Sequence, residues 1–110
     1  MKLKSVGEII AVRELLLVVD GRQDLVELAM GKPQPGLERT DFYCPYHIKG
    51  AGKDKVMAIL GIDPYQAMQL ALGAIGVELA VINRDSGGKL FWEGADKGNL
   101  DFPAPDWSEQ

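Results

Sequence analysis

Cysteine and histidine each occur only once in the 110 residues, as Cys44 and His47. A single cysteine excludes an internal disulfide framework and favours a reducing compartment, so we expect a protein of the bacterial cytoplasm. One cysteine and one histidine are too few for a metal site without carboxylates, and the acidic residues are scattered without a spacing such as His-Glu-x-x-His. The sequence therefore predicts no bound metal and no cofactor.

The chain also lacks a cluster of basic residues. Residues 1–55 carry nine Lys or Arg and eight Asp or Glu, a net charge of +1, whereas residues 56–110 carry three and eight, a net charge of −5. Without a basic patch to neutralise several phosphates, nucleic-acid binding is not expected. The acidic half favours either a basic partner or simple solubility.

Few charges interrupt the stretch from Val56 to Asn83, which holds only Asp63 and Glu78. The segment 64–84 is long enough to cross a membrane, but Gln66, Gln69, Glu78 and Asn83 interrupt it, so burial inside a soluble domain is the prediction. The amino terminus lacks an apolar signal-peptide core. A length of 110 residues fits one hydrophobic core, and no internal boundary divides it.

The pattern of apolar residues predicts five strands joined mostly by short turns. The first has apolar residues on both alternating faces and is predicted to be covered on both sides for much of its length. The Gly31–Gly36 loop is predicted to interrupt the sheet because Pro33 and Pro35 lack amide donors. The segment 55–61 fits a strand or a short helix, and the hairpin spacing favours the strand. The predicted strands are 8–19, 24–30, 41–49, 55–61 and 89–93.

Alternation along strand 41–49 assigns its two faces. The set on the predicted core face is Phe42, Cys44, Tyr46 and Ile48, and the opposite set includes Tyr43 and His47. Pro45 indicates an edge position, or one whose amide would point to solvent.

A long helix is predicted over residues 64–84. Asp63 is suited to cap its first turn, Pro64 to the first helical position, and Gln66 to bond back to the cap amide. Leu70 is expected in the core. Gly73 and Gly76 indicate either a close backbone approach or a tolerated glycine pair. The helix is expected to end at Asp85-Ser86-Gly87-Gly88.

Together these elements predict an α+β fold, with an antiparallel sheet of four to five strands packed on one long helix. The predicted domain covers residues 1–93. Residues 94–110 form an acidic, mostly irregular tail anchored on the domain by Leu100, Phe102 and Trp107.

Cys44 and His47 are the one pair that suggests nucleophilic chemistry, because a thiol needs a nearby base. Three residues apart on a strand, they point to opposite faces. A buried, inert cysteine and an exposed histidine are therefore favoured. Gly50-Ala51-Gly52-Lys53 lacks the spacing of a phosphate-binding loop and is predicted to be a turn.

Two motifs resemble those of a family of small bacterial proteins of unknown function. They are Tyr43-Cys44-Pro45-Tyr46-x-Ile48-x-Gly50 and Gly61-Ile62-Asp63-x-x-Gln66-Ala67-x-x-Leu70-Ala71-Leu72. The resemblance also touches Gly31-Lys32-Pro33 and covers roughly residues 8–93. It implies a compact sheet-plus-helix domain and brings no established activity.

The sequence favours a non-catalytic module that binds another protein, and the acidic carboxyl half favours a basic partner. A specific form is an immunity-type inhibitor that masks a basic toxin or nuclease. Two alternatives remain: a small enzyme that uses Cys44, and a structural subunit of a homo-oligomer that uses a sheet edge or the Gly73/Gly76 stripe. The candidate binding residues are Tyr43, His47, Asp101, Asp106 and Trp107.

Overall fold

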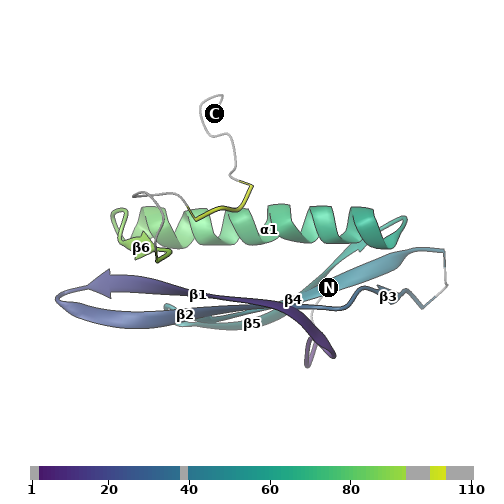
Figure 1. Cartoon of the computed structure of the whole chain (residues 1–110), viewed down its shortest axis with the longest axis horizontal. Coiled ribbons are helices and arrows are strands. Elements are labelled where there is room, and N and C mark those ends of the chain that lie inside the picture. The colour runs from purple at the N-terminus through teal and green to yellow at the C-terminus, as the bar shows by residue number, and fades with distance from the viewer. Residues whose placement is uncertain (1–2, 38–39, 94–99, 104–110) are drawn as a thin grey trace.

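A computed structural model describes residues 3–37, 40–93 and 100–103 of the chain (Figure 1). Six strands form one sheet in which every pairing is antiparallel, and one long helix packs against it. The predicted α+β fold is confirmed, and all five predicted strands are present. The elements are β1 (Ile9–Val19), β2 (Arg22–Gly31), β3 (Gln34–Pro35), β4 (Phe42–Gly50), β5 (Lys53–Gly61), α1 (Pro64–Asp85) and β6 (Leu90–Phe91).

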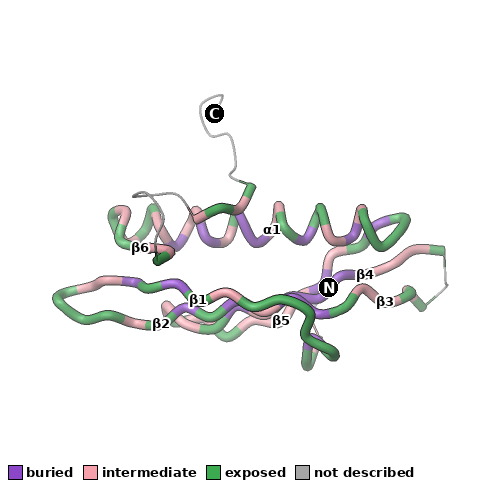
Figure 2. The backbone as a smooth tube through the Cα atoms, in the orientation of Figure 1, coloured by how far each residue is buried: buried purple, intermediate pink, exposed green. Residues whose placement is uncertain are grey.

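Two hairpins, β1–β2 and β4–β5, make up most of the sheet, and β2 pairs with β4 to join them. The short strand β6 extends the sheet beyond β1. Helix α1 runs along one face, and the buried residues lie mainly between the two layers (Figures 1 and 2). We call the sheet face opposite α1 the open face.

Both hairpins turn through two residues with positive φ. These are Asp20 and Gly21 at 52° and 78°, and Ala51 and Gly52 at 53° and 77°. Such pairs match the right-handed twist of the flanking strands, which is why an Asp-Gly dipeptide is a reliable hairpin signal. Ala51 adopts the same conformation without being glycine, asparagine or aspartate.

Pro35 was predicted to lie in a loop and Pro45 at a sheet edge or with its amide position towards solvent, and both are paired within the sheet. Pro35 lies in β3, opposite Phe42 of β4, so the prediction that its loop contains no strand is wrong. The strand is only two residues long, and a missing amide donor is tolerated there. Pro45 is central rather than at an edge. It lies between the part of β4 that pairs with β2 and the part that pairs with β3, so its missing donor interrupts neither ladder.

The prediction that β1 is covered on both sides is also wrong. Leu15 and Leu17 are buried beneath α1, but Val12 is 71% exposed and Leu16 is 37% exposed on the open face. With a single helix on one side of the sheet, the second apolar face of β1 remains at the surface.

Residues 3–8, which we call the amino-terminal segment, cover part of the open face. Leu3 donates its main-chain N–H to Val56 O at 3.1 Å, and Lys32 donates to Glu8 O at 2.8 Å. Val6 is buried, and a Cβ built on Gly31 would overlap its carbonyl. Pro45 is fully buried beside it, although it faces away from the helix.

The contacts at the start of α1 are those predicted from the sequence, with one exception. Asp63 Oδ1 accepts the N–H of Gln66 at 2.7 Å, and Pro64 occupies the first turn. The side chain of Gln66 accepts the N–H of Ile62 at 2.8 Å, instead of the amide of the cap residue as predicted. The helix ends where expected, and Gly87 and Gly88 have φ of 73° and 82°.

The helix buries one face, and Leu70 does not belong to it. Leu70 is 48% exposed, so the prediction that it lies in the core is wrong. Of the two alternatives for the glycine pair, a close backbone approach holds at Gly76, where an added Cβ would overlap the carbonyl of Pro103, whereas Gly73 has open space beside it. The helical residues that form the buried face are Ala67, Ala71, Ile75, Gly76, Leu79 and Ile82.

By length and composition alone, α1 is apolar enough to cross a membrane. In the fold its inner face packs on β4 and β5. Glu78 lies near the middle of the helix and contacts the sheet through its carboxylate. This packing is that of a helix in a folded domain, and the absence of a membrane partner stays a prediction.

Candidate functional site

The described part of the tail is held by Arg13 of β1. Its guanidinium donates to Leu100 O at 2.9 Å and lies 3.8 Å from the centroid of the Trp92 ring and 5.0 Å from that of Phe102. Asp101, a predicted binding residue, is 3.8 Å from the same guanidinium. Leu100 and Phe102 pack on the core, as predicted for tail anchors. Asp106 and Trp107 lie outside the described residues.

Tyr43 and His47 lie on the open face, as alternation requires. Tyr43 is beside the amino-terminal segment, where it lines a small groove with Pro45. His47 Nε2 is 2.6 Å from Asp54 Oδ1 of β5. The hydrogen bond with His47, with smaller help from the charges of His47 and Lys49, holds the pKa of Asp54 below its usual value. Asp101 contacts Arg13 of β1 and does not lie with Tyr43 and His47.

Cys44 is fully buried on the core face, opposite to His47. Burial raises the pKa of its thiol to about 11. Its closest polar contact is Gly31 O, 3.8 Å from Sγ. Among the described residues, the thiol contacts only main-chain carbonyls and no side-chain base.

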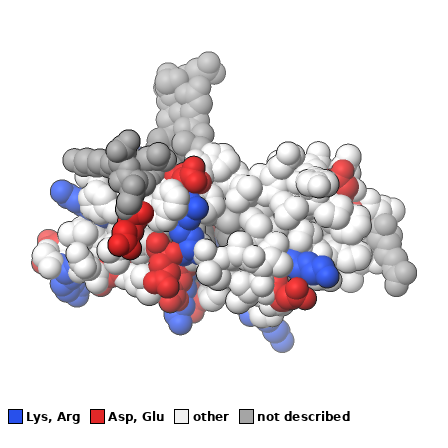
Figure 3. All heavy atoms as spheres, viewed as in Figure 1, with Lys and Arg blue, Asp and Glu red and all other residues white. Residues whose placement is uncertain are grey.

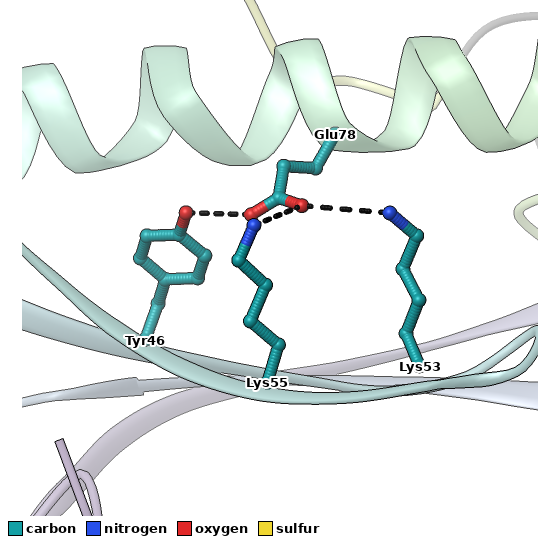
Figure 4. Close-up of polar contacts among 4 residues, drawn as sticks. All are labelled: Tyr46, Lys53, Lys55 and Glu78. Atoms are coloured by element: carbon teal, nitrogen blue, oxygen red, sulfur yellow. Dashed lines mark hydrogen bonds and ion pairs between the residues drawn. The ribbon is translucent and has the colours of Figure 1, made fainter. Parts of the chain in front are cut away.

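A polar cluster beneath α1 was not found from the sequence (Figure 4). Glu78 of α1 accepts the hydroxyl of Tyr46 at 2.7 Å and Lys55 Nζ at 3.1 Å, and Lys53 Nζ is 3.8 Å away. The Glu78 side chain is only 12% exposed. Burial, followed by the hydrogen bond and negative charge of Glu78, raises the pKa of Tyr46 well above its ordinary value.

This cluster ties the helix to β4 and β5. The raised pKa of Tyr46 favours its protonated hydroxyl, which donates to the Glu78 carboxylate, and Lys55 donates to the same carboxylate. Two signals in the sequence could have located it. Glu78 is a lone acid inside an apolar helix, and Lys53 and Lys55 share one face of a strand.

A row of charged side chains crosses the open face. Strand register places Glu14 opposite Glu27, Glu27 opposite Lys49, and Lys49 opposite Asp54. All four side chains are exposed. The Glu14–Glu27 pair brings like charges together at the β1 side, where cross-strand neighbours of one sign are unfavourable.

Aliphatic side chains lie on either side of this row. Val12 is opposite Ala29 on one side, and Leu16 is opposite Leu25 on the other. Leu25 is 41% exposed, and Ile9 and Ile10 near the start of β1 are 55% and 46% exposed. The β1–β2 part of the open face is thus unusually apolar for a solvated antiparallel sheet.

Two grooves flank β1, one on each side of the strand. The groove on the helix side has a volume of about 200 Å³ and is lined by Ala11, Leu72, Ile75 and Phe102, among others. The groove on the open face, of about 310 Å³, runs over Val12, Glu14 and Glu27 towards His47.

A larger cleft of about 520 Å³ lies at the carboxyl end of α1. Charges of both signs line it, from Asp20 and Asp85 to Lys53 and Lys89, so it selects for neither an anion nor a cation. Within residues 3–37, 40–93 and 100–103, no group of three or more His, Cys, Asp or Glu side chains is placed to hold a metal ion.

A family model described as a domain of unknown function, DUF6968, matches residues 11–104. The chain belongs to this family. The matched region includes both motifs that carry the resemblance, and it extends past Glu93 to the tail residues that contact Arg13. No curated protein and no solved structure matches the sequence.

Proposed function

We propose that the chain is a non-catalytic module of the bacterial cytoplasm that binds another protein through the β1–β2 part of its open face. The observation that carries the proposal is the exposed cross-strand pair Leu16 and Leu25 beside the carboxylates of Glu14 and Glu27. Contiguous apolar surface next to polar groups is typical of a protein interface.

The surroundings of the side chains that could support catalysis favour a binding module over an enzyme. Cys44 is buried, His47 is hydrogen-bonded to a carboxylate, and Glu78 is held by Tyr46 and a lysine. In the part of the chain that the structure describes, these groups do not form a nucleophile with its base. The alternative of an enzyme that uses Cys44 is correspondingly disfavoured.

The partner is expected to present a basic surface. The acidic residues of the open face and the net charge of −5 over residues 56–110 would attract it and orient it. An immunity-type inhibitor that masks a basic toxin or nuclease is the specific form of this proposal.

The test is capture of the partner from the source organism. The baits are the wild-type chain, the open-face variant Leu16→Ser/Leu25→Ser, and the control Tyr65→Ser/Leu70→Ser, which changes two exposed residues of α1. A basic protein retained by the wild type and the control, lost with the open-face variant and released by salt, would support the proposal. Equal capture by all three baits would contradict it. So would turnover of a small molecule that a point mutation abolishes without unfolding the chain.

A further inference from the structure

The outward edge of β1 is paired over only part of its length. Strand β6 pairs with Leu16 and Leu17, and Val18 donates its N–H to Lys89 O at 3.0 Å. From Ile9 to Leu15, no described residue forms a main-chain hydrogen bond to that edge. In Figure 1, β1 lies in front of the other long strands of the sheet.

The direction of its main-chain groups follows from the bond to β6. Because Val18 points its N–H outward and successive residues alternate, the N–H and C=O groups of Glu14 and Val12 also point outward. The irregularity between Ile9 and Ala11 ends this regular edge on one side, and β6 ends it on the other. The stretch 11–15 therefore offers room for about five residues of an added strand, roughly 16 Å.

The helix-side groove lies against the same stretch. Ala11, Leu72, Ile75 and Phe102 give it an apolar part, and the paired Arg13 and Asp101 also line it. Alternate side chains of a strand paired with 11–15 would point to this side of the sheet. A medium-sized aliphatic side chain fits the groove. Figure 3, viewed from the same side as Figure 1, shows acidic and basic side chains gathered left of the centre of this side, with mostly uncharged surface to the right of them.

On the open face, charge determines which side chains an added strand should carry. Glu14 has Glu27 as its cross-strand neighbour, while Lys49 lies on the far side of Glu27. A lysine or arginine placed beside Glu14 would give that carboxylate a partner of opposite sign. A second copy of this chain would instead bring another Glu14–Glu27 pair next to the first.

We propose that residues 11–15 of β1 bind an extended segment of a partner protein by strand addition. The segment places lysine or arginine beside Glu14 on the open face and an aliphatic residue in the helix-side groove. Main-chain hydrogen bonds supply affinity in this mode, and alternate side chains supply specificity. This inference rests on the proposed function and names its site and the chemistry of the partner.

The test uses three synthetic peptides and the full chain. The first peptide alternates lysine with valine or isoleucine, the second has glutamate in place of lysine, and the third is the lysine peptide N-methylated on the amides that would face β1. Titration should show saturable binding of the lysine peptide and no saturable binding of the other two peptides. The amides of Val12 and Glu14 should then become protected from hydrogen exchange.

Two variants locate the contact. Val12→Pro removes an outward donor that the β1–β2 ladder does not use, and should weaken binding by about tenfold or more. Val12→Ala keeps the donor and is its control. Glu14→Lys should transfer binding from the lysine peptide to the glutamate peptide. Melting temperatures show whether each variant is folded, and the N-methylated peptide tests the same contact on the wild-type chain.

Several results would overturn the inference. One is that the lysine peptide binds equally well after N-methylation of the peptide and after the Val12→Pro substitution in the chain. Another is that the lysine peptide shows no saturable binding even at low salt. A concentration-dependent dimer that Val12→Pro abolishes would place a second copy on this edge instead. If Leu16→Ser/Leu25→Ser blocks partner capture while Val12→Pro does not, the proposed function stands and strand addition fails.

Discussion

The guanidinium of Arg13 lies 3.8 Å from the centroid of the Trp92 ring and donates to Leu100 O at 2.9 Å. One side chain of the first strand thus holds both the residue that follows β6 and the described part of the tail. An Arg13→Met substitution keeps most of the apolar stem and removes the charge.

We expect Arg13→Met to lower the free energy of unfolding by about 1–3 kcal/mol, because a cation–π contact and a charged hydrogen bond are lost together. Arg22→Met is the control. The Arg22 side chain is 74% exposed, and its ion pair with Asp24, at 3.6 Å, is at the surface. Loss of this ion pair should therefore cost about 0.5 kcal/mol or less. Urea denaturation measures both, and equal effects would show that Arg13 does not hold the tail.

The two helical glycines should respond to alanine in opposite directions. Gly76→Ala would drive a methyl group into the carbonyl of Pro103 and should destabilise the chain by about 1–3 kcal/mol. Gly73→Ala enters open space and should stabilise it by about 1 kcal/mol through helix propensity. Thermal unfolding of the two variants provides the comparison. Stabilisation by both would mean that the tail does not cross α1 at Gly76.

Two leucines of α1 test which face is buried. Leu79 is 1% exposed, and Leu79→Ala should cost about 2–5 kcal/mol. Leu70 is 48% exposed, and Leu70→Ala should cost less than about 1 kcal/mol. Denaturant midpoints decide between them, and a larger loss at Leu70 would mean that the helix is rotated about its axis.

The pKa of Asp54 is lowered in the folded chain, first of all by its hydrogen bond with His47. The stability gained from this carboxylate is therefore present above its unfolded pKa, about 3.9, and is lost as pH falls through the folded value. Asp54→Asn should destabilise the chain at pH 5 and have a smaller effect near pH 3. A His47→Val background should remove this difference, and an unchanged difference there would mean that His47 is not the cause.

Cys44 should react with a thiol reagent only when the chain unfolds. Its side chain is fully buried, and burial raises its pKa to about 11, so the thiolate is scarce at neutral pH. The control is Cys44→Ala/Leu70→Cys, which places the thiol on the exposed face of α1 and should label quickly. Rapid labelling of the wild-type chain under native conditions would contradict the expected inertness.

The features that the sequence predicted correctly depend on neighbours close along the chain. The Asp63 cap and the glycines that end α1 are both local conformational preferences. The core face of β4 follows from strict alternation, and the opposite orientations of Cys44 and His47 follow from the same rule. Of the candidate binding residues, Tyr43 and His47 were correctly assigned to one face of a strand.

What the sequence could not decide is what each apolar face packs against. β1 carries leucines on both sides, and α1 is apolar around most of its circumference, so both patterns were compatible with full burial. Only the packing showed that one helix covers one face, which leaves Leu16 and Leu70 at the surface. The contacts of Glu78 likewise join α1 to β4 and β5, with Tyr46 32 residues and Lys55 23 residues before it in the sequence. Strand register and the rotation of the helix set them, and these depend on the whole core rather than on any local segment.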